Sequence, residues 1–114
     1  MSTQLDYFLN VDITDMTTGA VTGWVVAPDA GEVYEIAVVS SAATSATTLV
    51  TASIGSTAIT GGVVTMAADA APTRYACRPT AAKNVIEGDV IKVVTDGGTA
   101  TAAIGRCTIT IRRH

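Results

Sequence analysis

Side chains that could do catalytic chemistry are scarce in this 114-residue chain. A Ser-His-Asp arrangement needs a histidine held in a pocket as a base, and the one histidine is His114, at a terminus of the kind that usually frays. The pairs Gly61-Gly62 and Gly97-Gly98 match neither glycine-rich phosphate-binding motif and precede no helical pattern. We therefore expect no enzymatic activity, no catalytic residue and no small-molecule substrate.

Four acidic residues near two turns are the only candidates for a metal site. Asp12 and Asp15 lie near one turn, and Asp29 and Glu32 lie near the next. Calcium takes six to eight oxygen ligands, and no Cys-x-x-Cys or His-x-x-x-His spacing indicates a transition metal. We interpret these carboxylates as solvated turn residues and expect no metal or other cofactor, with calcium as the alternative.

The chain has two cysteines, Cys77 and Cys107. A disulfide between them would require adjacent strands. Because no basic segment followed by an apolar one opens the chain, we expect no secretion signal. Two buried free thiols are then the favoured state, and a disulfide is the alternative.

The composition favours strands and a sparsely charged surface. Val, Ile and Thr make up about 37% of the residues, and β-branched residues favour strands. Charged residues are only 15% and the mean hydropathy is +0.42, which excludes intrinsic disorder. The sequence pI of 4.8 argues against a nucleic-acid partner. No apolar run approaches the roughly 18 residues of a membrane span, so we expect no membrane partner.

Charge is divided unequally along the chain. Residues 1–73 contain seven acids and no base, whereas residues 74–114 contain seven bases and three acids. In the favoured interpretation, strands from the two ends lie side by side and neutralise each other within one subunit. In the alternative, faces of opposite sign meet between copies in an assembly.

Alternating or apolar segments separated by turn signals predict eight or nine short strands and no helix of ten or more residues. One helical turn is expected in Pro79–Asn84, capped by Thr80. Turn residues predict tight turns at Gly61-Gly62 and a hairpin-type turn at Asp96-Gly98. The predicted strands are Gln4–Thr14, Ala20–Ala27, Glu32–Ser40, Thr48–Ile54, Thr57–Thr60, Val63–Ala67, Thr73–Cys77, Val90–Thr95 and Ala103–Arg113. The pattern is typical of an all-β, antiparallel two-sheet sandwich of jelly-roll type, forming one domain over residues 1–114.

The first segment has one apolar side with a period of two. That side is made of Leu5, Tyr7, Leu9, Val11 and Ile13. Phe8 falls on the polar side, either as an ordinary exposed ring or as a contact with a partner. In Glu32–Ser40 both sides are partly apolar, which predicts a central strand: one side carries Tyr34, Ile36 and Val38, and the other carries Val33, Ala37 and Val39.

The last segment is expected to face the core with Cys107, Ile109 and Ile111. Three bases, Arg106, Arg112 and Arg113, gather near its end. They either protect an edge strand against aggregation or dock on an acidic partner. Only 17 charged residues are available to cover the whole domain, so much of the surface must be Thr, Ser, Ala and Gly. Short side chains lose little entropy when buried, which suits flat packing against other protein chains.

A set of turn-and-strand segments covers about three quarters of the chain from Val26 onward. These segments are Ala27–Val33, Thr48–Ile54, Thr60–Thr65, Asn84–Ile91, Thr95–Thr99 and Thr108–Arg113. They resemble small head-associated structural proteins of tailed bacteriophages, which are similar to capsid decoration, or cement, proteins. The resemblance implies an all-β fold, binding to the outer face of an icosahedral shell, and self-association. It assigns no individual functional residue.

We accordingly expect a decoration protein that binds the lattice of the major capsid protein, self-associates as a dimer or trimer, and is located on the virion after assembly in the host bacterial cytoplasm. Residues 1–14 are interpreted as a possible arm or exchanged strand. The expected contact residues are Leu5, Tyr7, Phe8, Leu9, Val11, Arg106, Arg112 and Arg113. The alternative is a carbohydrate- or receptor-binding β-sandwich of a virion fibre or spike, although only five aromatic residues are available to form a sugar platform.

Overall fold

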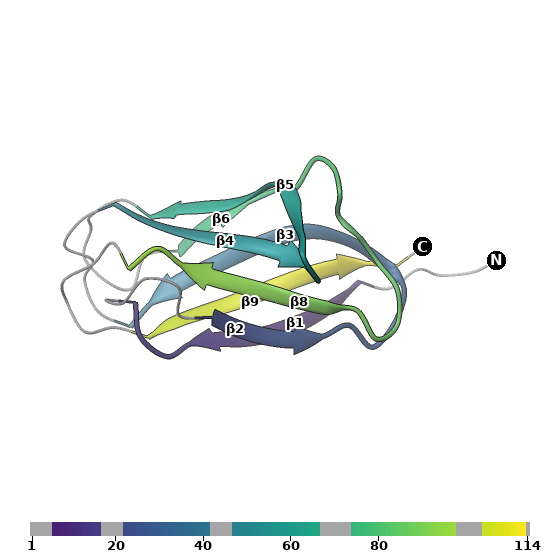
Figure 1. Cartoon of the computed structure of the whole chain (residues 1–114), viewed down its shortest axis with the longest axis horizontal. Helices are drawn as coiled ribbons and strands as arrows, with labels where there is room; N and C mark the ends of the chain where they lie inside the picture. The colour runs from purple at the N-terminus through teal and green to yellow at the C-terminus, as the bar shows by residue number, and fades with distance from the viewer. Residues whose placement is uncertain (1–5, 17–21, 42–46, 67–73, 98–103, 114) are drawn as a thin grey trace.

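Two antiparallel β-sheets pack face to face in the computed structural model, which describes residues 6–16, 22–41, 47–66, 74–97 and 104–113 (Figure 1). The described residues form nine strands and no helix, so none of them belongs to a helix that could cross a membrane. The strands are β1 (Tyr7–Ile13), β2 (Thr22–Val26), β3 (Gly31–Ser40), β4 (Thr48–Ile54), β5 (Thr57–Met66), β6 (Arg74–Cys77), β7 (Asn84–Val85), β8 (Val90–Thr95) and β9 (Gly105–Arg112). The predicted all-β sandwich is confirmed.

The strand order shows how segments distant in sequence come together. The first sheet, sheet A, has the order β1-β9-β3-β6, with the short β7 also paired to β3. The second sheet, sheet B, has the order β2-β8-β4-β5. At one side of the sandwich β1 packs beside β2, and at the other side β5 packs beside β6 (Figure 1). Most connections between successive strands therefore cross from one sheet to the other, as in a jelly roll.

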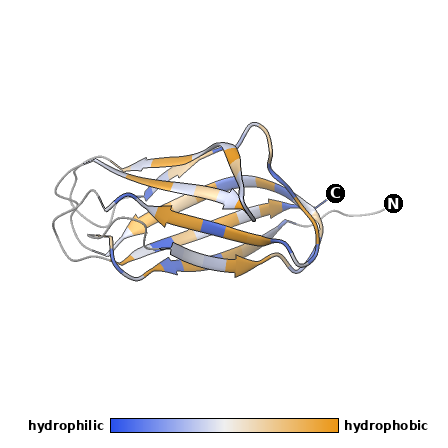
Figure 2. Ribbon diagram, viewed as in Figure 1, coloured by the Kyte–Doolittle hydropathy of each residue, from blue (hydrophilic) through white to orange (hydrophobic). Residues whose placement is uncertain are grey.

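The core is the layer of inward-facing side chains between the sheets. Along each strand every second side chain points inward, because the side-chain period of a strand is two. Fully buried residues on the central strands include Ile36, Ile91, Val93, Ile109 and Ile111. The alternation of apolar and polar colour along the ribbons follows this division (Figure 2).

A register shift in β3 corrects the predicted assignment of its two faces. The pairing with β9 shifts between Val33 and Glu35, so one extra residue is accommodated and the alternation changes phase. Val33 is consequently buried with Ile36 and Val38, whereas the prediction placed Val33 on the opposite face. Tyr34, predicted to share the face of Ile36, is only partly buried.

Residues 57–66 form one strand, not the two predicted. Gly61 has φ of 76°, a conformation that glycine adopts easily, and it lies within β5 beside a register shift in the pairing with β4. The backbone at Gly61-Gly62 therefore disturbs the pairing of β5 with β4 locally, but it does not reverse the direction of the chain.

The segment after β6 also differs from its prediction. Residues 79–84 contain no helical turn; instead Ala81 forms an isolated bridge with Thr60, and β7 pairs with the start of β3. The hairpin-type turn predicted at residues 96–98 does not join a hairpin, because the strands that flank it, β8 and β9, belong to different sheets; Gly98 itself lies outside the described residues. Of the expected contact residues, Leu5 lies outside the described residues, as do residues 1–4 of the predicted arm.

The unequal charge distribution is resolved within one subunit. The antiparallel pair β1 and β9 brings the two ends of the chain together. The described residues include five ion pairs that each join an acid of the first 73 residues to a base of the last 41. They are Arg74–Glu35, Arg78–Glu35, Lys83–Glu32, Arg112–Asp6 and Arg113–Asp29. The favoured interpretation of the charge pattern is thus confirmed for these residues.

Candidate interaction surfaces

The candidate contact residues of β1 lie on both sides of the strand. Phe8 points outward from sheet A with 64% of its surface exposed. Tyr7 and Leu9 are partly buried against the core, and Val11 belongs to it. The hydroxyl of Tyr7 donates a hydrogen bond of 2.6 Å to the carbonyl oxygen of Asp29. A second protein could reach the inward side chains only if β1 left its own sheet, whereas Phe8 is already accessible.

The three candidate arginines have different surroundings. Arg106 is exposed on the outer face of sheet A opposite Asp12, and no ion-pair partner lies within 4 Å among the described residues. The Nε atom of Arg112 lies 3.8 Å from the Oδ1 atom of Asp6. Arg113 lies near Asp29, at 3.7 Å, and its guanidinium is 5.1 Å from the centre of the Tyr7 ring. Two of the three arginines therefore already form ion pairs within the subunit.

Ion pairs and contacts between arginine and tyrosine side chains are also found on the outer face of sheet A, which we call the ionic face. Glu35 pairs with both Arg74 and Arg78. The guanidinium groups of Arg112 and Arg78 lie 3.9 and 4.8 Å from the centre of the Tyr34 ring. Solvent-exposed ion pairs of this kind contribute only about 0–1 kcal/mol each. Their main consequence is that the face is well hydrated and nearly neutral.

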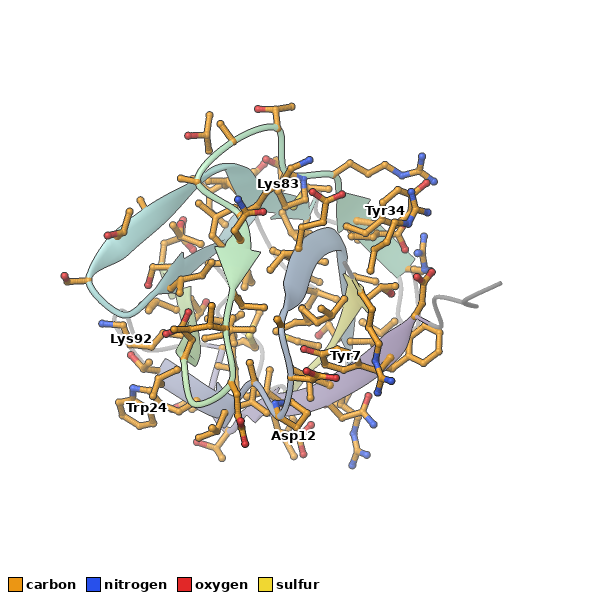
Figure 3. The ribbon with its side chains drawn as sticks, turned by 90° about the vertical axis from the view of Figure 1, so that its right-hand side faces the viewer. Tyr7, Asp12, Trp24, Tyr34, Lys83 and Lys92 are labelled. Carbon is orange, nitrogen blue, oxygen red and sulfur yellow. The ribbon has the colours of Figure 1, made fainter. Side chains whose placement is uncertain are left out.

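The outer face of sheet B has the opposite character, and we call it the apolar face. The four strands of sheet B contain one charged residue, Lys92, whereas the strands of sheet A contain six charged residues. Figure 3 shows Trp24 and Lys92 on one side of the sandwich and Tyr34 on the other. The exposed large apolar side chains on these strands are Trp24 (64%), Val26 (57%), Val63 (42%) and Val90 (36%).

Strand pairing groups most of these side chains at one end of the apolar face. Trp24 lies directly opposite Lys92, and Val26 lies opposite Val90. The turn that follows β7 adds Ile86, which is 65% exposed; this turn is held against the end of β2, because the Gly88 amide donates to the carbonyl oxygen of Ala27. An exposed apolar group of this kind marks an interaction surface.

None of the described residues that were predicted as contacts lies on the apolar face. The available signal was the absence of any charged residue from the predicted strand Ala20–Ala27. What could not be read from the sequence is that this segment, Val90–Thr95 and Ile86 come together, because that depends on which strands pair.

Neither candidate calcium pair gains further acidic ligands in the described part of the chain, where no three His, Cys, Asp or Glu side chains gather to hold a metal ion. Asp29 lies beside Arg113 and accepts a hydrogen bond from the amide of Ala30, and Glu32 lies beside Lys83.

A shallow depression of about 240 Å³ is lined by Ile54, Thr57, Ala82 and Asn84. It contains no carboxylate or aromatic side chain that would bind a cofactor.

Both cysteines are free thiols, as predicted, but only Cys107 is buried, whereas Cys77 is partly exposed. Cys77 lies on β6 and Cys107 on β9, and β3 runs between these two strands. Burial, with a smaller contribution from the charge of Asp12, raises the pKa of the Cys107 thiol to about 12 from an ordinary value of 9.0. Burial and the nearby Glu35 also raise the pKa of Cys77.

The raised pKa of Cys107 predicts a loss of stability at alkaline pH. Below about pH 9 the thiol keeps its proton in both states, so stability is unaffected. Between pH 9 and 12 only the unfolded chain loses the proton, and stability falls by about 1.4 kcal/mol per pH unit. Urea denaturation at pH 8 and pH 10.5 should therefore show a loss about 2 kcal/mol larger in the natural protein than in Cys107→Ala. Equal losses in the two proteins would contradict this result. Cys77→Ala, which keeps Cys107, should retain more of the alkaline loss than Cys107→Ala does.

No protein-family model matches the chain. No curated protein sequence matches it either.

Solved structures do resemble the fold. One is a chain in the acidic stable capsid structure of Helicobacter pylori bacteriophage KHP30, with a TM-score of 0.60 and 10% identity over 98% of this chain and 93% of that one. Another is the CBM36-1 domain of a xylanase from the hindgut metagenome of Trinervitermes trinervoides, with a TM-score of 0.60 and 14% identity over 90% and 96% of the two chains. A third is carbohydrate-binding module CBM36 in complex with calcium and xylotriose, with a TM-score of 0.58 and 15% identity over 95% and 98%.

These neighbours define the class of fold: a β-sandwich domain of the type found both in a phage capsid and in carbohydrate-binding modules. The identities of 10–15% establish the fold alone.

Proposed function

We propose that this protein is a phage capsid decoration protein, which binds the outer surface of the major capsid protein lattice and stabilises the head. Its location would then be the virion surface. The observation that carries the proposal is the pair of exposed aromatic residues on opposite faces, Phe8 on the ionic face and Trp24 on the apolar face, each 64% exposed. A subunit with two opposed contact faces suits an assembly, in which neighbours cover more than one side.

The likeness to a chain of the KHP30 capsid supports this proposal at the level of size and fold. The match covers 98% of this chain and 93% of that one, so the two chains have nearly the same length. A domain of the same size and architecture can therefore be part of a phage capsid.

The ionic face is the side we assign to the capsid lattice. It offers Phe8 as an apolar anchor and Arg106 as a base without an ion-pair partner among the described residues. Aromatic and arginine side chains contribute disproportionately to binding at protein interfaces. Each contact would be weak, but several contacts per assembled unit raise the overall avidity. A protein that binds the mature lattice preferentially stabilises that lattice by mass action.

Capsids assembled without this protein provide the test. The added protein should co-sediment with them and raise their melting temperature. Phe8→Ser should weaken binding at least tenfold, and a tenfold change corresponds to about 1.4 kcal/mol. Asn10→Ser, on the same face of β1, is the matched control and should bind normally. The proposal fails if the folded protein neither sediments with capsids nor changes their melting.

A carbohydrate-binding module of a virion fibre or spike is the second candidate, and Trp24 is the observation that favours it. An exposed indole with Lys92 and then Ser53 beside it in one row across sheet B could stack on a sugar ring and hydrogen-bond its hydroxyls. Titration of Trp24 fluorescence with xylo- and cello-oligosaccharides distinguishes the two functions. A saturable change abolished by Trp24→Ala would favour sugar binding, and no change would favour the capsid.

A further inference from the structure

A bulge in β3 directs two neighbouring side chains to the ionic face. The pairing of β3 with β9 shifts between Val33 and Glu35. Tyr34 and Glu35 are both partly exposed, although the residues on either side of them are buried. A regular strand would turn one of these two side chains into the core, because its side chains alternate. Bulges that redirect side chains in this way are frequent next to functional sites.

Three arginines from different elements gather around this ring and this carboxylate, and we call them the arginine cluster. They are Arg74 on β6, Arg78 just after β6 and Arg112 at the end of β9. Arg74 and Arg78 share the two carboxylate oxygens of Glu35. The guanidinium groups of Arg78 and Arg112 lie 4.8 and 3.9 Å from the centre of the Tyr34 ring. One ring and one carboxylate therefore hold three guanidinium groups close together.

The positive charge of the arginine cluster exceeds the negative charge beside it. Among the described residues, the carboxylates within 4 Å of these guanidinium groups are those of Glu35 and Asp6, so three bases face two acids. Glu32, which is paired with Arg112 across β3 and β9, has Lys83 as its ion-pair partner. Between 46% and 66% of each arginine side chain is exposed. Each guanidinium carries about five N–H donors, so most of these donors are left to water.

The proposed capsid anchor, Phe8, lies in the same part of the ionic face. Phe8 is paired with Thr110, and Thr110 is paired with Glu35, so the three residues form one row across sheet A. Two strand spacings, roughly 10 Å, separate Phe8 from Glu35. A standard interface covers about 800 Å² of each partner, so a partner centred on Phe8 also removes water from the arginine cluster. Guanidinium groups that lose water without gaining an acceptor weaken an interface.

We propose that the arginine cluster binds an acidic segment of the protein partner on the ionic face. The inference rests on the proposed function, since it names the chemistry that the capsid lattice presents to this face. A carboxylate balances the surplus charge and can accept two parallel N–H bonds from one guanidinium. The Tyr34 ring restricts two of the guanidinium groups before binding, which reduces the entropy lost. Nucleic acid would need a longer basic surface, and this chain has a formal net charge of −3.

Titration of the protein with hexaglutamate, followed by the backbone amide signals in two-dimensional NMR, tests the site without capsids. The signals of Tyr34, Glu35 and Arg112 should shift saturably. Binding should weaken as salt is added, because salt screens exposed charges. Arg78→Gln should weaken the binding by about threefold or more, which is the effect of losing one exposed charge pair.

Glu35→Gln distinguishes an anion site from a network of ion pairs that only stabilises the fold. The substitution removes the internal competitor for Arg74 and Arg78, so hexaglutamate should bind more tightly by about threefold or more. A purely structural network predicts no such gain. Glu87→Gln is the matched control, because it removes the same charge from the exposed turn after β7 and should change the binding little. Circular dichroism checks that each variant is folded.

Three results would each overturn the inference: no shift at the arginine cluster, an Arg78→Gln variant that binds equally well, or a Glu35→Gln variant that binds no better than Glu87→Gln. Binding of a short single-stranded oligonucleotide at the cluster in place of hexaglutamate would overturn it as well. Sedimentation with capsids separates these outcomes from failure of the proposed function. A protein that sediments with capsids but ignores hexaglutamate overturns the acidic segment alone, whereas one that binds hexaglutamate at the cluster but ignores capsids overturns the capsid assignment alone.

Discussion

Replacing Ile109 with alanine should destabilise the protein by about 2–5 kcal/mol. Ile109 is fully buried on β9 and lies opposite Leu9 on one side and Ile36 on the other. Removing its outer carbons leaves a cavity between strands that are held from both sides and cannot easily collapse. Small domains have only about 5–15 kcal/mol of stability in total, so this single change removes a large part of it.

The measurement is urea denaturation followed by far-UV circular dichroism. Trp24 is already 64% exposed in the folded protein, so its fluorescence is a poor reporter of unfolding. Thr108→Ala is the matched control on the same strand, because Thr108 points outward and makes only an exposed hydrogen bond of 3.3 Å to Asn10. The control should cost no more than about 1 kcal/mol. Similar losses for Ile109→Ala and the control would show that β9 is not central to the core.

Gly31→Ala should be the second most damaging change, at about 3 kcal/mol or more. A Cβ atom at Gly31 would lie 2.6 Å from the carbonyl oxygen of Arg112 and 2.7 Å from the Cγ2 atom of Ile111. The first of these contacts is with the backbone of β9, the strand paired with β3, and that backbone cannot rotate away as a flexible side chain can. The start of β3 would have to separate from β9.

Gly55→Ala is the control that separates crowding from backbone conformation. Gly55 has φ of 59°, and no atom lies within 4 Å of a Cβ added there. Alanine at this position should therefore cost only the left-handed conformation, about 1–2 kcal/mol. Denaturation midpoints of the two variants give the comparison. A cost at Gly31 equal to or below the cost at Gly55 would mean that β3 and β9 tolerate the shift.

The candidate site was only partly predictable. The period of two in Gln4–Thr14 correctly separated Phe8 from its neighbours, and the structure places this ring outside. The same period indicated that Tyr7, Leu9 and Val11 share the inward side, so their selection as contacts depended on β1 being exchanged between subunits. Arg112 and Arg113 were selected for their charge, but the strand pairing placed them beside Asp6 and Asp29.

The amino-acid sequence by itself determined most of the strand segments and that they form an all-β sandwich, because side-chain alternation and turn residues act over a few neighbours. It also determined the shortage of charge. Only the tertiary structure decided that the bases of one half of the chain lie beside the acids of the other, that Val33 turns inward at a bulge, and that sheet B collects the uncharged strands on one face. These features depend on which strands pair and in which register, and pairing between distant segments is settled by the packing of the whole chain.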